Sequence, residues 1–205
     1  MKKVLVSSAY LPPIEWFALL FHSEMYIERW ENFQKQTIRN RARILTSQGF
    51  YDLIVPIRHS SDKSITDTKI SHKEQWQRQH CRTIVSAYRK APYFEHYWPE
   101  IEPLLMENHL YLFDFNQNLI GSFCKILGVE EPAHSAIWIK NPTELIDLRA
   151  GLNAEDEPVV IIDPYMHVFP IEQSHASGLS ILDLVFNLGP ESGLFLKNNC
   201  HLSSF

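Results

Sequence analysis

Residues 3–21 read Lys3-Val4-Leu5-Val6-Ser7-Ser8-Ala9-Tyr10-Leu11-Pro12-Pro13-Ile14-Glu15-Trp16-Phe17-Ala18-Leu19-Leu20-Phe21. The short apolar run at the start is rich in branched residues and ends in serines, which predicts a first strand over residues 3–8. The proline pair then fixes two φ angles, and Pro13 can occupy a first helical turn because its missing N–H costs nothing there. The stretch therefore predicts a strand, a turn and a helix.

The rest of the chain contains further strands and a helical middle. Strand-like runs lie at residues 25–27, 50–57, 136–139 and 158–162. Residues 72–89 and 110–127 look helical, and Gly128 ends the second of these segments. Because proline interrupts a helix, we expect only short helices around Pro99 and Pro103. This order predicts an α/β fold: a single domain over residues 1–205, with a mixed sheet and a largely helical middle segment.

Composition excludes several classes of protein. The 205-residue chain has a formal net charge of −5, which argues against broad nucleic-acid binding. Its three cysteines lie far apart, so we expect a reducing compartment and no disulfide framework. No stretch is apolar for long enough to predict a membrane span or a signal peptide, and the histidines lack the spacing of a metal site. We therefore expect a cytoplasmic protein with no metal centre.

A run of positive charge stands out from this acidic background. Between Asn32 and Tyr51 the chain carries four cations and no carboxylate, namely Lys35, Arg39, Arg41 and Arg43. A bound anion would explain why no carboxylate relieves their mutual repulsion, and arginine suits such a role because its planar fork can hold two oxygens. Asn40 adds a donor and an acceptor. The alternative is a solvated basic edge.

The secondary structure of this basic run is ambiguous from its pattern. A helix would stack Lys35, Arg39 and Arg43 on one face, where like charges repel. A strand would place Arg39, Arg41 and Arg43 on one face. Because Ser47-Gln48-Gly49 forms a turn before the strand-like run at residues 50–57, a β-hairpin is the better interpretation.

Other polar residues have both functional and structural interpretations. His80 shares a helical stripe with Trp76 and could act as a general acid or base, or it could be a packed core histidine. Tyr165 and His167 alternate with Phe169, so in a strand they would line one side and could bind substrate, although such alternation also suits packing. Ser180 and Asp183 fit a helix N-cap and its reciprocal partner, and Gly189 ends that helix.

Several motifs occur in an order that resembles the WbqC-like protein family. They are Tyr10-x-Pro12-x-Ile14-x-Trp16-Phe17, Gln34-Lys35-x4-Asn40-Arg41, Val55-Pro56-Ile57, Trp76-x3-His80, Tyr88-x2-Ala91-Pro92-Tyr93-Phe94 and Leu179-Ser180-Ile181-Leu182-Asp183-Leu184-x-Phe186-Asn187-x-Gly189. The resemblance runs from the first strand to the last helix. The chain departs from it in two places: the region after Asp147-Leu148-Arg149 is short, and Tyr165-x-His167-x-Phe169 has His where we expect Gln. The resemblance implies a cytoplasmic bacterial protein that modifies an activated sugar.

Together these observations predict a transferase acting on an anionic activated metabolite in bacterial surface-polysaccharide metabolism. The donor would be a nucleotide-linked sugar or an acyl or aminoacyl donor, and electrostatic positioning would carry most of the rate effect. We expect His80 to move a proton, and we expect the substrate to be held by Lys35, Arg39, Asn40, Arg41, Tyr10, Tyr165 and His167. The alternative is a non-catalytic ligand-binding or scaffold protein of the same pathway. The pattern names no cofactor and no oligomeric state.

Overall fold

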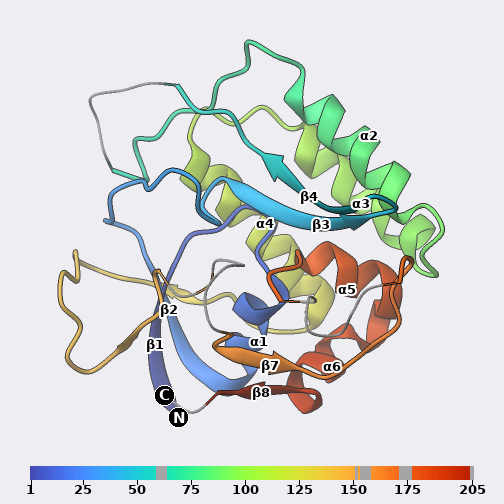
Figure 1. Cartoon of the computed structure of the whole chain (residues 1–205). Helices are drawn as coiled ribbons and strands as arrows, with labels where there is room; N and C mark the ends of the chain where they lie inside the picture. Colours follow the sequence, from blue (N-terminus) through green and yellow to red (C-terminus); the bar gives the residue numbers. More distant parts are fainter. Residues whose placement is uncertain (59–63, 151, 153–157, 171–176, 204–205) are drawn as a thin grey trace.

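The computed structural model describes the chain except for residues 59–63, 151, 153–157, 171–176 and 204–205 (Figure 1). Its helices are α1 (Ile14–His22), α2 (Trp76–Tyr88), α3 (Phe94–Met106), α4 (Leu112–Leu127), α5 (Ile181–Leu188) and α6 (Ser192–Asn198), with a 3-10 turn, η2 (Gly189–Glu191). Its strands are β1 (Lys2–Ser7), β2 (Ser23–Glu28), β3 (Arg41–Thr46), β4 (Gly49–Ile54), β5 (Ala133–His134), β6 (Ile146–Asp147), β7 (Val160–Ile162) and β8 (Cys200–Leu202). Helices with both parallel and antiparallel strands confirm the predicted α/β class.

The first strand lies inside a four-stranded parallel sheet with the order β5-β2-β1-β6. β1 pairs with β2 from Lys2 opposite Ser23 to Ser7 opposite Glu28, and α1 connects the two strands. The chain thus adds β2 and β5 on one side of β1 before it returns to the other side with β6. Strand order therefore reverses between β1 and β6. In doubly wound folds, ligands bind at the carboxyl ends of the strands beside such a point.

The end of the basic run forms a hairpin, as predicted, but Lys35 and Arg39 lie in turns before the strand, so Arg39 does not share a strand face with Arg41 and Arg43. β3 and β4 pair antiparallel, from Arg41 opposite Ile54 to Thr46 opposite Gly49. One face of β3 is buried, because Ala42 and Ile44 are 5% and 0% exposed. Arg41 and Arg43 lie on the other face and are half-buried. The period of two residues therefore separates the apolar from the cationic side chains of this strand.

The helical middle is formed by α2, α3 and α4. The predicted stripe on α2 is confirmed, since Trp76, His80, Ile84 and Tyr88 are all buried. Gly128 ends α4 with a φ of 67°, a left-handed conformation that glycine adopts without strain. The expectation of short helices around Pro99 and Pro103 is wrong, because both prolines lie inside the continuous helix α3. Packing of the α3 rings Phe94 and Trp98 on Phe186 of α5 compensates for the hydrogen bonds that the prolines remove.

The last part of the chain supplies a small antiparallel sheet, β7 with β8, and the helices α5 and α6. The strand predicted at residues 158–162 is confirmed as β7. The strand predicted at residues 136–139 is wrong, because the nearby strand is β5 and Ile137 is 73% exposed. The backbone of this run pairs with none of the described strands. The Ile139 N–H donates to the Glu28 carboxylate over 3.0 Å.

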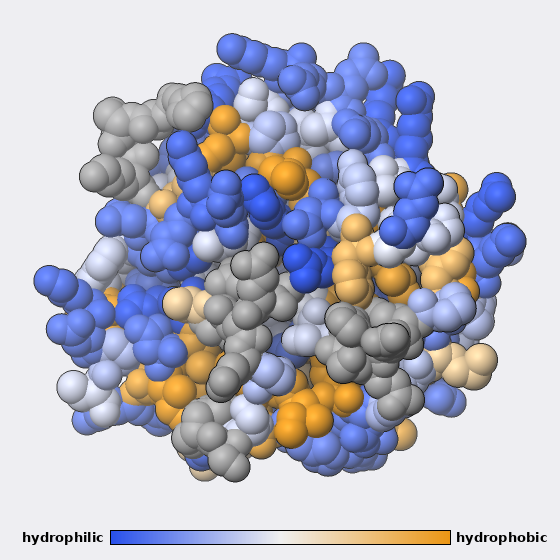
Figure 2. All heavy atoms as spheres, viewed as in Figure 1, coloured by the Kyte–Doolittle hydropathy of each residue, from blue (hydrophilic) through white to orange (hydrophobic). Residues whose placement is uncertain are grey.

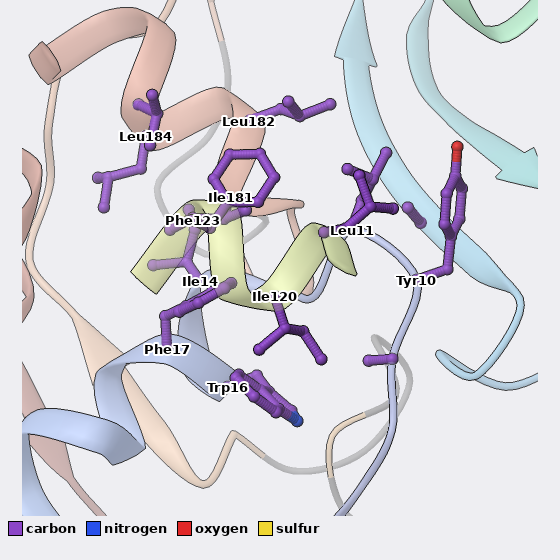
Figure 3. Packing of buried hydrophobic residues seen from close by; sticks show 14 of the residues in the cluster. Tyr10, Leu11, Ile14, Trp16, Phe17, Ile120, Phe123, Ile181, Leu182 and Leu184 are labelled. Carbon is purple, nitrogen blue, oxygen red and sulfur yellow. The ribbon is translucent and has the colours of Figure 1, made fainter. Parts of the chain in front are cut away.

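The core gathers around the opening strand, turn and helix. Figure 3 shows Ile14 and Phe17 of α1 between α4, which contributes Ile120 and Phe123, and α5, which contributes Ile181 and Leu184. Tyr10 and Leu11 of the turn extend the same cluster towards the hairpin (Figure 3). On the face seen in Figure 2 hydrophilic side chains predominate and hydrophobic ones form separate groups. Within the described ranges, no helix has the length and hydropathy needed to cross a bilayer.

Candidate functional site

The basic segment lies along the turn between β1 and α1. The Tyr10 N–H donates to the Ile38 carbonyl over 2.9 Å, and the Asn116 side chain of α4 bridges the Arg39 carbonyl (2.9 Å) and Ser8 Oγ (3.3 Å). At the other end the Ser180 N–H donates to the Arg43 carbonyl over 2.7 Å. Ile38 and Arg39 of the basic segment therefore lie beside the turn that follows β1, whereas Arg43 lies beside residues 179–180.

The four cations have different surroundings, and Arg39 is the most buried of them. Arg39 is 1% exposed and forms a two-point ion pair with Glu31, with Nε 2.9 Å from Oε1 and Nη2 against Oε2. Glu31 stands just before the carboxylate-free run, so the charge of Arg39 is compensated in space although not in sequence. Ser7 Oγ donates to the same carboxylate over 3.2 Å. The Arg39 guanidinium is thus already occupied by a protein anion.

Arg43 and Lys35 lie nearer the solvent. Arg43 Nε is 3.3 Å from Asp52 Oδ1 across the hairpin, and its guanidinium lies 5.6 Å from the centre of the Phe50 ring. Lys35 is exposed in the turn that precedes β3. Arg43 is therefore a cation with a surface partner, and Lys35 is a solvated cation near the same segment.

Arg41 lacks such a partner. Its Nε is buried, and its side chain makes no hydrogen bond or ion pair within the part of the chain that the structure describes. Buried polar atoms in proteins nearly always have a hydrogen-bond partner, so an unpartnered buried guanidinium N–H calls for one. A ligand oxygen would supply it. Of the sequence-predicted cations, Arg41 is the one whose surroundings leave it available for an anion.

Other unpartnered buried atoms adjoin the same turn. Asn40 donates through Nδ2 to the Val55 carbonyl over 2.9 Å, but its Oδ1 has no partner, and neither does Oδ1 of Asn116. Glu15, in the first turn of α1, uses Oε1 to accept from Ser177 Oγ and the Gly178 N–H, while its Oε2 is unpartnered. Burial raises the pKa of the Glu15 carboxyl. The β1–α1 turn thus offers an anion binder together with amide and carboxyl oxygens.

Tyr10 and His80 are joined to each other in the core. Tyr10 is fully buried, and its hydroxyl lies 2.9 Å from Nδ1 of His80, which is 5% exposed. The His80 ring also bonds to the Ile54 backbone, and burial lowers its pKa to about 4. Burial also raises the pKa of the Tyr10 hydroxyl, which stays protonated. His80 is therefore neutral near pH 7 with both ring nitrogens occupied, a geometry that suits packing better than proton transfer.

Tyr165 and His167 both contact the carboxylate of Asp183, which the sequence analysis interpreted as a helix-capping residue. They lie beyond β7 and not in a strand, yet Tyr165 Oη and His167 Nδ1 are 2.8 and 2.7 Å from Asp183 Oδ1. Ser180 is the N-cap of α5, as predicted, and its Oγ accepts from the Leu182 N–H. Asp183 as its reciprocal partner is wrong, because the Ser180 N–H donates to Arg43 and the Asp183 side chain faces Tyr165 and His167.

Tyr165 and His167 also line a cavity of about 510 Å³ between the segment after β7 and the helices α5 and α6. Its polar wall includes Lys90, Asn187, Glu191 and the Asn198–Asn199 pair, and Leu194 and Phe195 contribute apolar surface. The sequence pattern found the two aromatic side chains of this site. It did not assign Asp183 to the site, because the position of Asp183 in the first turn of a helix suggested a capping role. Its partners Tyr88, Tyr165 and His167 come from other segments.

The described residues include neither a cluster suited to bind a metal ion nor an activated cysteine. They hold no group of three histidine, cysteine, aspartate or glutamate side chains placed to share a metal ion. Burial raises the pKa of Cys81 to about 11 and those of Cys124 and Cys200 to about 12. Because the thiolate is the reactive form, these cysteines are not activated nucleophiles.

Comparison with known proteins agrees with the motif order. The family model described as "WbqC-like protein family" matches residues 7–157, and the chain belongs to this family. The match includes the basic run and ends before Tyr165, His167 and Asp183. The chain is also 27% identical, over 96% of its own length and 98% of the relative's, to the uncharacterized protein Rv1507c of Mycobacterium tuberculosis. No solved structure matches it.

Proposed function

We propose that this protein is a transferase that binds the anionic part of an activated metabolite through Arg41. The donor is a nucleotide-linked sugar or an acyl or aminoacyl donor, used in the cytoplasm for bacterial surface-polysaccharide metabolism. The observation that carries the proposal is the buried, unpartnered Nε of Arg41 at the start of β3. Membership of the WbqC-like family is consistent with it.

The electrostatic setting supports a small anionic ligand. Arg41 can donate to a phosphate or carboxylate oxygen without first breaking a protein ion pair, whereas Arg39 would have to leave Glu31. A guanidinium in a partly dry site interacts more strongly with an anion than one in water. Asn40 Oδ1 and Glu15 Oε2 could accept from donor groups of the same ligand. With a net charge of −5, the chain does not suit the many phosphate contacts of nucleic-acid binding.

A thermal-shift comparison of three proteins tests the anion site. Wild type, Arg41→Gln and Arg43→Gln are each titrated with pyrophosphate, ATP, UDP-glucose and acetyl-CoA. Arg43→Gln is the matched control, because Arg43 lies two residues away on the same face of β3 and already pairs with Asp52. We expect at least one of these anions to raise the melting temperature of wild type and Arg43→Gln, with affinity for Arg41→Gln weaker by about tenfold or more, equivalent to about 1.4 kcal/mol.

Two results would reject the anion site: equal binding by Arg41→Gln, or no binding of any of the four anions by wild type. Incubating the bound donor with the protein and analysing it by mass spectrometry then separates enzyme from scaffold. A donor that binds and is never altered in the presence of cell-extract metabolites would favour the non-catalytic alternative.

A further inference from the structure

We propose that His167 and Asp183 form a general-base dyad, which removes a proton from the hydroxyl or amine of an acceptor bound in the cavity between the segment after β7 and the helices α5 and α6. This inference rests on the proposed transferase function and adds the acceptor side of the same reaction. Both residues lie outside the part of the chain that the family model matches.

The dyad is defined by a short hydrogen bond between two buried groups. His167 Nδ1 lies 2.7 Å from Asp183 Oδ1, and the two side chains are 8% and 1% exposed. An imidazole nitrogen that faces a carboxylate carries the proton, so Nδ1 is the donor, and in the neutral ring the lone pair is on Nε2. Nε2 lies across the ring, away from Asp183, and has no protein partner among the described residues.

Two tyrosines and an asparagine hold the Asp183 carboxylate in place. Tyr165 donates to Oδ1 over 2.8 Å, Tyr88 donates to Oδ2 over 3.0 Å, and Asn187 Nδ2 lies 3.3 Å from Oδ1. Burial raises the pKa of both tyrosine hydroxyls, so they remain protonated donors. These three donors fix both oxygens of the carboxylate, so Oδ1 stays turned towards His167 Nδ1. It is therefore a positioning residue that fixes the orientation of the ring.

The cavity supplies the room and the polarity that an acceptor needs. Its volume of about 510 Å³ is in the range of small-molecule sites, and His167 and Tyr165 stand in its wall together with Lys90 and Glu191. The Tyr165 and His167 rings lie with centres 4.1 Å apart, which limits rotation of the imidazole. In Figure 1 the chain after β7 runs beside α5 and α6, so three separate segments enclose the cavity.

The dyad and Arg41 are connected through the first turn of α5. Ser180 at its N-cap is hydrogen-bonded to Arg43, two residues beyond Arg41 on β3, and Asp183 lies in the same turn of the helix. Glu15 is also close enough for its charge to raise the pKa of Tyr165. Residues 178–183 thus contact Glu15 and the Arg43 backbone and also include Asp183 of the dyad.

In the proposed step, the acceptor oxygen or nitrogen attacks the electrophilic atom of the donor while its proton passes to His167 Nε2. A new bond forms between acceptor and donor. The bond from the electrophilic atom to the anionic leaving group breaks, and the leaving group takes the electron pair. The imidazolium then returns its proton to the leaving group or to water. Such base catalysis typically contributes about 10²–10⁴-fold to a rate.

Hydrolysis of p-nitrophenyl acetate, a neutral activated ester, tests the dyad without a known substrate. Water takes the place of the acceptor, its proton goes to Nε2, and nitrophenolate leaves. We compare wild type with His167→Gln, which removes the imidazole, and with His201→Gln. His201 is the matched control, since it is 3.7 Å from Asp163 but 59% exposed and outside the cavity wall. His167→Gln should lose the protein-dependent rate by about tenfold or more, and His201→Gln should keep it.

A structural role for His167 would leave different signatures. Diethyl pyrocarbonate modification of folded wild type, mapped by mass spectrometry, should label His167 at its free nitrogen and spare His80, whose ring nitrogens are both occupied. Nitrogen NMR should show the Nδ1–H tautomer of His167 in wild type and its loss in Asp183→Asn. Absence of a protein-dependent ester hydrolysis in wild type, an unchanged rate in His167→Gln, or an unlabelled His167 would each overturn the dyad.

The same variants separate this inference from the anion site. The first pattern is weaker anion binding by Arg41→Gln in the thermal-shift assay. The second is slower ester hydrolysis by His167→Gln than by wild type and His201→Gln. Failure of the first pattern alone rejects the proposed function, and failure of the second alone rejects the dyad.

Discussion

The Arg39 guanidinium lies against the Glu31 carboxylate, and both side chains are buried, with 1% and 6% exposed. Removing one member of such a pair leaves an uncompensated buried charge. Arg39→Gln should therefore lower the free energy of unfolding by about 3–5 kcal/mol in a urea titration at pH 7. Arg43→Gln, which removes a partly exposed partner of Asp52, should cost no more than about 1 kcal/mol.

The double variant Glu31→Gln, Arg39→Gln provides the internal check. It removes both charges, so it should be more stable than Arg39→Gln alone. If the single variants at positions 39 and 43 cost the same, the Arg39–Glu31 pair is not a structural element of the turn.

His80 should make stability depend on pH. Burial lowers its pKa from 6.5 to about 4, so the unfolded chain binds more protons than the folded chain between these values. The contribution of His80 is complete above pH 6.5 and decreases as the pH falls towards 4, by up to about 3 kcal/mol. The measurement is urea unfolding at pH 7 and pH 4.5 for wild type and His80→Asn.

His80→Asn should lose less stability than wild type between these two pH values, whatever its stability at pH 7. Equal losses would show that His80 titrates normally and is not the buried neutral ring described above. His80→Asn should also leave anion binding in the thermal-shift assay unchanged, because a core residue does not contact the ligand.

Gly189 and Gly128 both have positive φ, 55° and 67°, but their ψ angles are −125° and 36°, so only Gly128 is left-handed helical. A Cβ on Gly189 would lie 2.4 Å from the Tyr93 ring, whereas one on Gly128 would meet nothing within 4 Å. Gly128→Ala should cost about 1–2 kcal/mol. Gly189→Ala should cost at least about 3 kcal/mol, because displacement of a ring adds to the strain. Thermal unfolding of the two variants gives the comparison, and similar costs would contradict the close contact.

Ser180 should contribute to stability as a helix cap. Its Oγ accepts from the Leu182 N–H over 3.3 Å at the start of α5. Ser180→Ala should cost about 0.5–2 kcal/mol and Ser180→Gly less, because glycine tolerates the cap position. Both variants should retain anion binding. A Ser180→Ala protein of undiminished stability that no longer binds or hydrolyses would instead assign Ser180 to the site.

The elements that could be predicted are those whose signals are local. The strand, proline turn and helix at residues 3–21, the hairpin of the basic run and the Gly128 stop each follow from period or turn chemistry. The continuous helix α3 could not be predicted, because aromatic packing on Phe186 outweighs two local helix breakers. The exposed run at residues 136–139 has the composition of a strand, but it pairs with no other strand in the described part of the chain.

In the site, too, local signals could be predicted and contacts between distant segments could not. The charge pattern pointed to the segment that holds Arg41, but only the fold shows that Glu31 occupies Arg39 and that Asp52 faces Arg43. Asp183 has a satisfactory local explanation as a capping residue. Its hydrogen bonds come from Tyr88, Tyr165 and His167, on two segments distant in sequence, and no local pattern contains that information.

The hydrogen bonds of α5 to the opening turn and the hairpin also determine when the site can form during synthesis. The Ile181 N–H donates to the Pro12 carbonyl and the Ser180 N–H to the Arg43 carbonyl, so residues from opposite ends of the chain complete the same structure. A chain is made from its N-terminus, so α5 is synthesised after α1 and β3. Until α5 has been made, the nascent protein carries the apolar face of α1 and the Pro12 and Arg43 carbonyls without these partners.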